Sequence, residues 1–264
     1  MTFVNRKIYP YFEEANEGIL KLFPKVKTLP SPRVLDVGCG CGTLAEVLKA
    51  RGYECWGIEK HPQAADQATR RLDRLIHADL TQVREIASQL EPEIFDYLVF
   101  SDILEHLYDP LTIIEQYLFF LKPGGKVFLS IPNVAVWEIR LKLLFGFFNY
   151  QDCGILDRAH IRFFTFRTAR KLVEATGCRI IRVDYTPYII RAFLPLIKRF
   201  FRKPHPFFVV SEPSRAIFDS PYYGIYRKWI YPVEYILAGL WKSMFAFRII
   251  IAAQKNGKQG VTGG

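Results

Sequence analysis

A glycine-rich stretch at residues 34–42, VLDVGCGCG, constrains the fold of this 264-residue chain more than any other feature. A buried strand over 33–37 runs into three alternating glycines, Gly38, Gly40 and Gly42, and a helical pattern follows. Glycine lets the backbone turn with positive φ and lets a ligand approach the main chain closely. A strand, a glycine turn and a helix in this order predict a nucleotide-binding corner of an α/β fold.

Strand and helix patterns alternate along the rest of the chain. Apolar runs predict further strands over 53–58, 75–78, 95–100, 126–131, 179–184 and 247–253. Helical spacing predicts helices over 10–23, 43–51, 62–74, 82–90, 111–121 and 166–176, and KPGG at 122–125 predicts a turn. This order predicts a doubly wound, mostly parallel, seven-stranded Rossmann-like sheet, with a helical cap inserted before the last strand.

The net charge of +10 is distributed unevenly. Residues 1–185 carry 24 Lys/Arg against 23 Asp/Glu, whereas residues 186–264 carry 12 against 3. We therefore expect a core domain over 1–185 and a basic, aromatic cap or membrane-docking insertion over 186–246. The last core strand is expected at 247–254, and a disordered tail at 255–264.

Three apolar stretches have no single interpretation. Residues 188–203, YIIRAFLPLIKRFFRK, and residues 229–247, with Trp229 and Trp241, mix aromatic and basic side chains. Such segments suit an anionic lipid surface, and equally a helical cap or a dimer interface. Residues 134–153 are predicted to form a lid, part of an apolar pocket, a membrane-touching edge or plain core packing. Nucleic acid is a disfavoured partner because the cations are mixed with much aliphatic surface.

The cysteines and the hydropathy of the chain indicate its cellular compartment. Five cysteines without framework spacing predict reduced thiols. The N-terminal segment carries acidic residues where a secretory signal needs an apolar stretch. The longest uncharged run, 127–137, is shorter than the roughly 18–20 residues of a membrane span. We expect a cytoplasmic protein, at most peripheral on the inner face of the membrane.

Two acidic residues indicate which nucleotide the glycine turn suits. Glu59 ends the second strand, 21 residues beyond Gly38, where a carboxylate can accept both ribose hydroxyls. Asp36 precedes the turn, where a carboxylate would repel a pyrophosphate but attract the cationic amino group of a methionine moiety. The spacing G-x-G-x-G also departs from the dinucleotide pattern G-x-G-x-x-G. Together these features favour S-adenosylmethionine over NAD.

With these motifs the chain resembles the class I S-adenosylmethionine-dependent methyltransferases, especially the small-molecule, quinone and glycan branch. The resemblance covers about residues 5–185 in six ordered blocks: VLDVGCGCG, WGIEK, HADL, FDYLVFSDILEHLYDP, LKPGGKVFLSIPN and GILDRAHIRFFTFRTARKLVEATG. It implies that the three glycines line the methionine side and that Glu59 holds the ribose. It implies further that Lys60 and His61 border the adenine and that Asp79 meets its amino group. It also implies that Ser101 and Asp102 form the floor of the pocket near the methyl group.

Two histidines are candidates for the base that an oxygen or nitrogen acceptor requires. His106 follows the fourth strand, and His160 lies in the segment DRAHIRFFT. Asp157, His160 and Arg162 together are predicted to orient an acceptor hydroxyl, take its proton and hold an anionic group. The alternative is structural: His106 contacts the backbone and His160 braces its loop. We predict His160 rather than His106 as the base, and no metal, because neither histidine has ligand neighbours at suitable spacing.

The sequence thus predicts methyl transfer to oxygen of a small-molecule, lipid-linked or glycan acceptor. Two other classes stay open: an NAD(P)-dependent oxidoreductase, and a non-catalytic, membrane-associated protein that binds S-adenosylmethionine. A serine hydrolase is disfavoured because the chain has no G-x-S-x-G elbow. The identity of the acceptor and the oligomeric state do not follow from the sequence.

Overall fold

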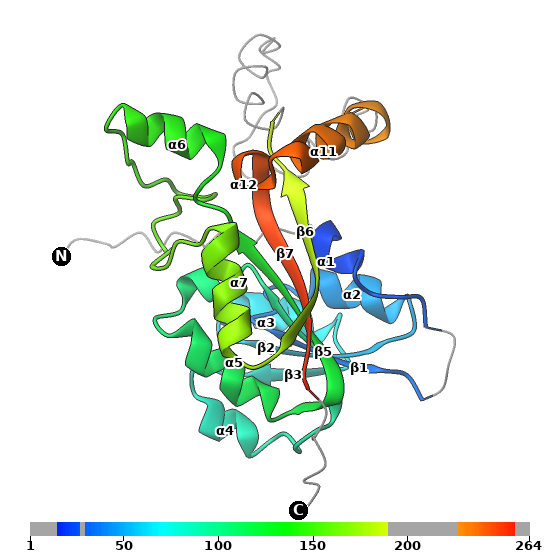
Figure 1. Ribbon diagram of the computed structural model, residues 1–264. Helices are drawn as coiled ribbons and strands as arrows, with labels where there is room; N and C mark the ends of the chain where they lie inside the picture. Colours follow the sequence, from blue (N-terminus) through cyan, green and yellow to red (C-terminus); the bar gives the residue numbers. More distant parts are fainter. Residues whose placement is uncertain (1–14, 27–29, 190–225, 257–264) are drawn as a thin grey trace, which may run out of the picture.

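A seven-stranded sheet forms the centre of the computed structural model, which describes residues 15–26, 30–189 and 226–256 (Figure 1). The strands are β1 (Arg33–Val37), β2 (Glu54–Glu59), β3 (Arg74–His77), β4 (Phe95–Ser101), β5 (Leu121–Pro132), β6 (Arg179–Pro187) and β7 (Ala246–Gln254). Their spatial order is β3-β2-β1-β4-β5-β7-β6. Strands β1 to β5 pair in parallel, and β7 runs antiparallel between β5 and β6. The predicted mostly parallel sheet is confirmed.

Helices cover both faces of this sheet. They are α1 (Glu17–Leu20), α2 (Thr43–Lys49), α3 (Pro62–Thr69), α4 (Val83–Ala87), α5 (Pro110–Leu118), α6 (Trp137–Leu144), α7 (Phe166–Ala175), α11 (Tyr231–Leu240) and α12 (Lys242–Phe245), with the 3-10 turn η1 (Leu104–His106) and the π-helical turn η3 (Tyr226–Ile230). Successive residues of a strand point to opposite faces of the sheet. In β1, Val34 packs with α1, α2 and α3, whereas Leu35 lies in the core that α4, α5 and α7 cover. Burying such a side chain stabilises the fold by roughly 1.5–3 kcal/mol.

Several predicted boundaries differ from the structure: α3 ends at Thr69 rather than at 74, α5 at Leu118 rather than at 121, and β6 at Pro187 rather than at 184. A helix was expected over 10–23, but α1 covers only four of these residues and begins after Asn16, which caps it by accepting from the backbone N–H of Gly18 and Ile19. Residues 1–14 lie outside the described part. Strand β5 begins at Leu121 rather than at 126: Leu121 pairs with Phe95, and Lys126 with Tyr97. The intervening KPGG segment is therefore an irregularity within the strand rather than a separate turn.

The segment between β6 and β7 is helical where the structure describes it. Helices α11 and α12 precede β7, and with α6 they lie at one end of the molecule (Figure 1). Residues 190–203 of the aromatic and basic segment, and the tail from 257, fall outside the described residues. Core packing accounts for Val136 and Ile139 of the apolar stretch 134–153 but not for its second part, because Leu144 is 78% exposed and most residues from 141 to 150 are exposed. Among the described residues, no helix has the length and apolar composition to cross a membrane.

Candidate cofactor and acceptor site

The strand order reverses between β1 and β4, and ligands of open α/β sheets bind beyond the carboxyl ends of the strands at such a point. The glycine turn follows β1 here, and Ser101 and Asp102 follow at the end of β4. Glu59 ends β2 next to the turn. The fold therefore brings to one edge of the sheet several residues that the sequence places far apart.

The glycine turn has a backbone that other residues would strain. Gly38, Gly40 and Gly42 have φ values of 79°, 54° and 76°, all in the left-handed region. A Cβ atom at Gly38 would come within 2.8 Å of the Ile103 side chain, and one at Gly42 within 3.2 Å of Cα of Ala68. The turn thus needs glycine for conformation and for space.

Glu59 ties the glycine turn to the next loop. Its carboxylate accepts hydrogen bonds from the backbone N–H of Gly40 at 3.0 Å and of His61 at 2.7 Å. The side chain is only 6% exposed. A carboxylate fixed in this way stands at the end of β2, where a ribose-binding acid is expected.

Asp36 is a buried carboxylate with an unused oxygen. It is 3% exposed, and its Oδ1 atom has no hydrogen-bond partner among the described residues. Burial, and secondarily the charge of Glu59, raises the pKa of Asp36 to about 7. A buried acceptor without a donor is costly unless a ligand supplies one. The site therefore fits a cationic or N–H-bearing ligand group beside the turn, as the amino group of S-adenosylmethionine would be.

The predicted adenine-side residues lie at the protein surface. Lys60 Nζ lies 3.5 Å from Oδ2 of Asp79. Oδ1 of Asp79 accepts from the backbone N–H and the hydroxyl of Thr81. Burial alone would raise the pKa of Asp79, but these hydrogen bonds and Lys60 lower it. His61 precedes α3 as its N-cap residue. These residues are close to Glu59, and their contact with adenine stays a prediction.

A polar network joins Ser101 and Asp102 to residues that the sequence argument missed. Asn16 Nδ2 donates to Ser130 Oγ at 2.9 Å and to Ser101 Oγ at 3.2 Å. Asp102 accepts from Ser130 Oγ at 2.7 Å and forms an ion pair with Arg248 at 2.9 Å. Asp102 also has a φ of 52°, a strained value for a residue other than glycine. In the sequence, the single arginine within the apolar run of β7 indicated that Arg248 has a charged partner. No feature of the sequence singled out Asn16.

The rings of His106 and His160 pack against each other. Their ring centroids are 4.7 Å apart with a T-shaped arrangement. Nδ1 of His106 lies 3.1 Å from the carbonyl oxygen of Ala159, and Nδ1 of His160 lies 2.9 Å from that of Ile155. Because a carbonyl only accepts, we assign the proton of each ring to Nδ1 and a lone pair to Nε2 in the neutral form. Burial, followed by the nearby His160, lowers the pKa of His106.

Glu105 joins the histidine pair as a third buried group. It is 2% exposed, its Oε1 lies 3.9 Å from Nε2 of His160, and its Oε2 has no hydrogen-bond partner in the described part of the chain. Burial, and secondarily the charge of Asp102, raises the pKa of Glu105 well above its usual value. Because the protonated form of Glu105 carries no charge, we do not treat its contact with His160 as an ion pair.

This cluster corrects one premise of the sequence argument. Glu105, His106 and His160 offer possible metal-ligand atoms that lie within 4.8 Å of one another. The histidines therefore do have ligand neighbours, because the fold brings together residues 54 positions apart in the sequence. The absence of a metal therefore stays a prediction that ligand spacing does not support.

Asp157 and Arg162 brace the loop in this structure. Asp157 Oδ1 accepts from the backbone N–H of Ala159 at 2.8 Å. Arg162 donates from Nε and Nη2 to the carbonyl oxygen of Tyr108, at 3.0 and 2.6 Å. Both residues flank His160 as expected, and their contact with an acceptor stays a prediction.

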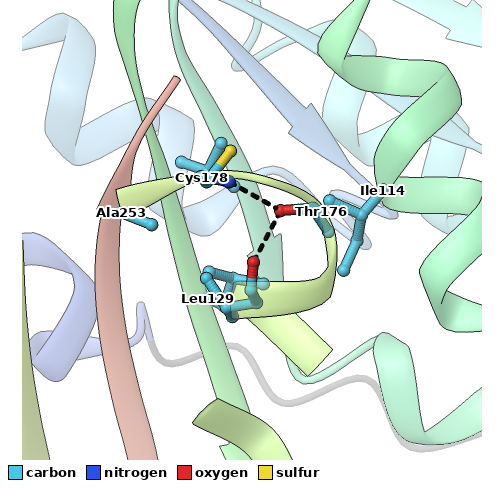
Figure 2. A pocket seen from close by; sticks show the side chains of 7 residues that line it. Ile114, Leu129, Thr176, Cys178 and Ala253 are labelled. Atoms are coloured by element: carbon cyan, nitrogen blue, oxygen red, sulfur yellow. Dashed lines mark hydrogen bonds between the residues drawn. The ribbon is translucent and has the colours of Figure 1, made fainter. Parts of the chain in front are cut away.

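An apolar crevice elsewhere in the fold is part of the packing (Figure 2). Ile114 of α5, Leu129 of β5 and Ala253 of β7 line it, with Thr176 and Cys178 after α7. The Thr176 hydroxyl donates to the Val173 carbonyl oxygen at 2.7 Å and lies 3.4 Å from the Cys178 backbone N–H. The lining thus offers no unsatisfied hydroxyl to a ligand, and the crevice does not extend the site at the glycine turn.

Two curated relatives share part of this sequence. Both are named ubiquinone biosynthesis O-methyltransferase, from Xanthomonas campestris pv. campestris (strain B100) and Pseudomonas putida (strain W619). They are 38% and 36% identical over 108 and 109 residues, which are 40% of this chain and 45% and 47% of theirs. The chain thus matches less than half the length of these relatives.

Solved structures resemble the whole fold. A SAM-dependent methyltransferase from Archaeoglobus fulgidus gives a TM-score of 0.57 at 17% identity, covering 90% of this chain and 91% of that one. Phosphoethanolamine N-methyltransferase 2 of Haemonchus contortus, in complex with S-adenosyl-L-methionine, gives 0.57 at 21% identity, covering 91% and 52%. Residues 8–183 match the family described as Methyltransferase domain, which is more than half of the chain. This chain therefore belongs to the methyltransferase-domain family.

Proposed function

We propose that this chain transfers a methyl group from S-adenosylmethionine to an oxygen atom of a small, largely apolar acceptor. The observation that carries the proposal is Asp36, a buried carboxylate with an unpaired oxygen beside a glycine turn. A carboxylate there suits the cationic amino group of S-adenosylmethionine and opposes the pyrophosphate of NAD(P). Membership of the methyltransferase-domain family supports the same choice.

Each residue around the turn would bind a different part of S-adenosylmethionine. Asp36 would neutralise the amino group, and Glu59 would accept the ribose hydroxyls while its bonds to Gly40 and His61 keep it in place. Asp79 would accept from the adenine amino group, because its lowered pKa keeps it ionised. The bound molecule supplies a methyl group that its sulfonium already activates.

The histidine pair would remove the acceptor proton. Nδ1 of each ring donates to a carbonyl, so Nε2 is the atom that can take a proton. We keep His160 as the proposed base, with His106 packed against it at 4.7 Å. His160 is 8% exposed, whereas His106 is half-buried, so the acceptor must reach the pair from the His106 side. Asp157 and Arg162 would hold the loop that carries His160.

The names of the relatives support the acceptor class. The relatives are named for O-methylation in ubiquinone biosynthesis, and the 108 matched residues support oxygen as the acceptor atom here. A lipid-linked acceptor would also suit the exposed apolar residues of α6. Peripheral membrane contact through residues 186–246 belongs to this proposal, and a glycan acceptor is the variant that it leaves open.

One experiment tests both the activity and the acceptor class. Labelled S-adenosylmethionine is incubated with the protein and a cell extract, which is then split into organic-soluble and aqueous fractions. Label in the organic fraction, lost with Glu59→Ala and His160→Ala, supports the proposal. Label only in the aqueous fraction rejects a lipid-soluble acceptor. Binding of S-adenosylhomocysteine without any transfer favours a non-catalytic protein, and its displacement by NADH favours an oxidoreductase.

A further inference from the structure

Helix α11 turns its apolar side away from the protein. Val233, Ile236, Leu237 and Leu240 recur three and four residues apart, on one side of the helix, and all are exposed, Leu240 by 82%. The other side carries Glu234, which is 1% exposed. A surface helix of a globular protein normally does the opposite. The outer side of α11 therefore needs an apolar partner.

Polar contacts on the inner side fix this orientation. Glu234 accepts a hydrogen bond from the backbone N–H of Ile189 at 2.6 Å. The Tyr185 hydroxyl donates to the carbonyl oxygen of Tyr235 at 2.6 Å, and the two rings stack with centroids 4.6 Å apart. A Cβ atom at Gly239 would come within 2.8 Å of the same hydroxyl. Rotating α11 to bury its aliphatic side would break these contacts, so the exposure is built into the fold.

Helix α6 presents a second apolar surface next to the same segment of chain. Leu141, Leu144 and Phe145 are exposed. Trp137 of α6 donates from Nε1 to the carbonyl oxygen of Tyr188 at 2.9 Å, and the Tyr188 hydroxyl lies 2.8 Å from Oε2 of Glu138. Since Ile189 binds α11, residues 188 and 189 hold both helices at one end of the molecule (Figure 1).

The exposed charges of the segment that carries α11 have one sign. In the described segment 226–245 the sole acid is the buried Glu234, whereas Lys228 and Lys242 are exposed. On α6, Glu138 is bound to Tyr188 and to Lys142 at 2.6 Å. Trp229 and Trp241, both exposed, stand at the two ends of the α11 stripe. Tryptophan beside lysine at the edge of an apolar stripe is typical of helices that lie in the headgroup region of a bilayer.

We infer that the exposed sides of α6 and α11 form one docking face for an anionic lipid bilayer. The face consists of Leu141, Leu144, Phe145, Val233, Ile236, Leu237 and Leu240. Helix α11 has ten residues, about 15 Å of helix, against about 30 Å of hydrocarbon core, so it lies in the interface and does not span it. The face binds lipid without any methyl transfer, although it would give a lipid-soluble acceptor a short route to the site.

Vesicle sedimentation with the full-length chain tests this inference. The probe is phosphatidylcholine vesicles containing roughly a third phosphatidylglycerol, at low salt. The variants Ile236→Asp/Leu240→Asp and Leu144→Asp/Phe145→Asp should each lower the partition coefficient roughly tenfold or more. Phe119→Asp is the matched control, because Phe119 is an exposed aromatic residue after α5, outside the docking face, and should leave binding unchanged.

Binding of S-adenosylhomocysteine separates this proposal from the proposed function and checks folding. All four proteins should bind it equally, since no varied residue lies at the glycine turn. Brominated lipid should quench the fluorescence of Trp229 and Trp241, and added salt should weaken binding. Failure to bind anionic vesicles overturns the inference, as does binding that the face variants leave unchanged. A dimer that Ile236→Asp/Leu240→Asp converts to monomer, without vesicle binding, assigns the face to a second copy and also overturns it.

Discussion

The proposed contact of Asp36 with the cofactor's amino group predicts how the affinity for the cofactor depends on pH. With a pKa of about 7, roughly one tenth of Asp36 is ionised at pH 6 and roughly nine tenths at pH 8. Only the ionised form neutralises an amino group, so the affinity for S-adenosylhomocysteine should rise about tenfold between these two pH values. Asp36→Asn should bind the ligand about tenfold or more weakly at pH 8, because it loses a charged hydrogen-bond partner.

The stability of the ligand-free protein should change in the opposite direction. Burial raises the pKa of Asp36 from 3.8 to about 7, so its contribution to stability is fully present below pH 4 and is lost as the pH rises through 7. The unfolding temperature of Asp36→Asn relative to the natural chain should therefore increase from pH 5 to pH 8. Ligand binding should oppose this loss at pH 8.

Calorimetric titration at pH 6, 7 and 8 measures the affinity, and thermal unfolding at the same pH values measures the stability. Asp96→Asn is the matched control: Asp96 starts β4 at the opposite edge of the sheet, where it accepts from the backbone N–H of Arg33 and from Lys122. It should keep the pH dependence of binding. If Asp36→Asn keeps that dependence too, another group titrates and the assignment of Asp36 is wrong.

Three further outcomes are expected. Glu59→Gln should weaken binding of S-adenosylhomocysteine roughly tenfold in calorimetry, because an amide cannot accept all the hydrogen bonds that the carboxylate accepts; unchanged affinity would remove Glu59 from the ribose. His160→Asn should lower kcat about 10²–10⁴-fold if it is the base, and His106→Asn less; the reverse order would exchange their roles. Dialysis against a chelator should leave the transfer rate unchanged, since the sulfonium already activates the methyl group and the proposed base is a histidine; a loss that added metal restores would contradict this.

The sequence was informative wherever a local signal decides the structure. The strand before the glycine turn is buried on both faces, so its run of apolar residues is unmistakable, and β2 and β3 lie within one residue of their predicted places. Glycine at 38, 40 and 42 marked a turn whose φ values only glycine tolerates easily. The position of Glu59 was predictable because α2 and β2, which separate it from the glycine turn, have characteristic lengths.

Other features depend on contacts between distant residues. Asn16 and Arg248 reach the end of β4 from 86 and 146 positions away, so no local pattern reports which residues they contact. The histidine pair became visible only when the loop after β5 packed against η1. Spacing did reveal that residues 229–247 are apolar, but it could not say which side of α11 faces the sheet, because a buried Glu234 decides that.

The antiparallel pairing of β7 with β6 affects how the segment between these strands can change during evolution. Pro187 at the end of β6 pairs with Ala246 at the start of β7, so the chain leaves the sheet and returns to it at neighbouring positions. Paired strand residues are only about 5 Å apart, a gap that a tight turn can close. The intervening segment can therefore be lengthened, shortened or exchanged with little effect on sheet register. This junction lets one catalytic scaffold acquire different attachments while its cofactor edge stays the same.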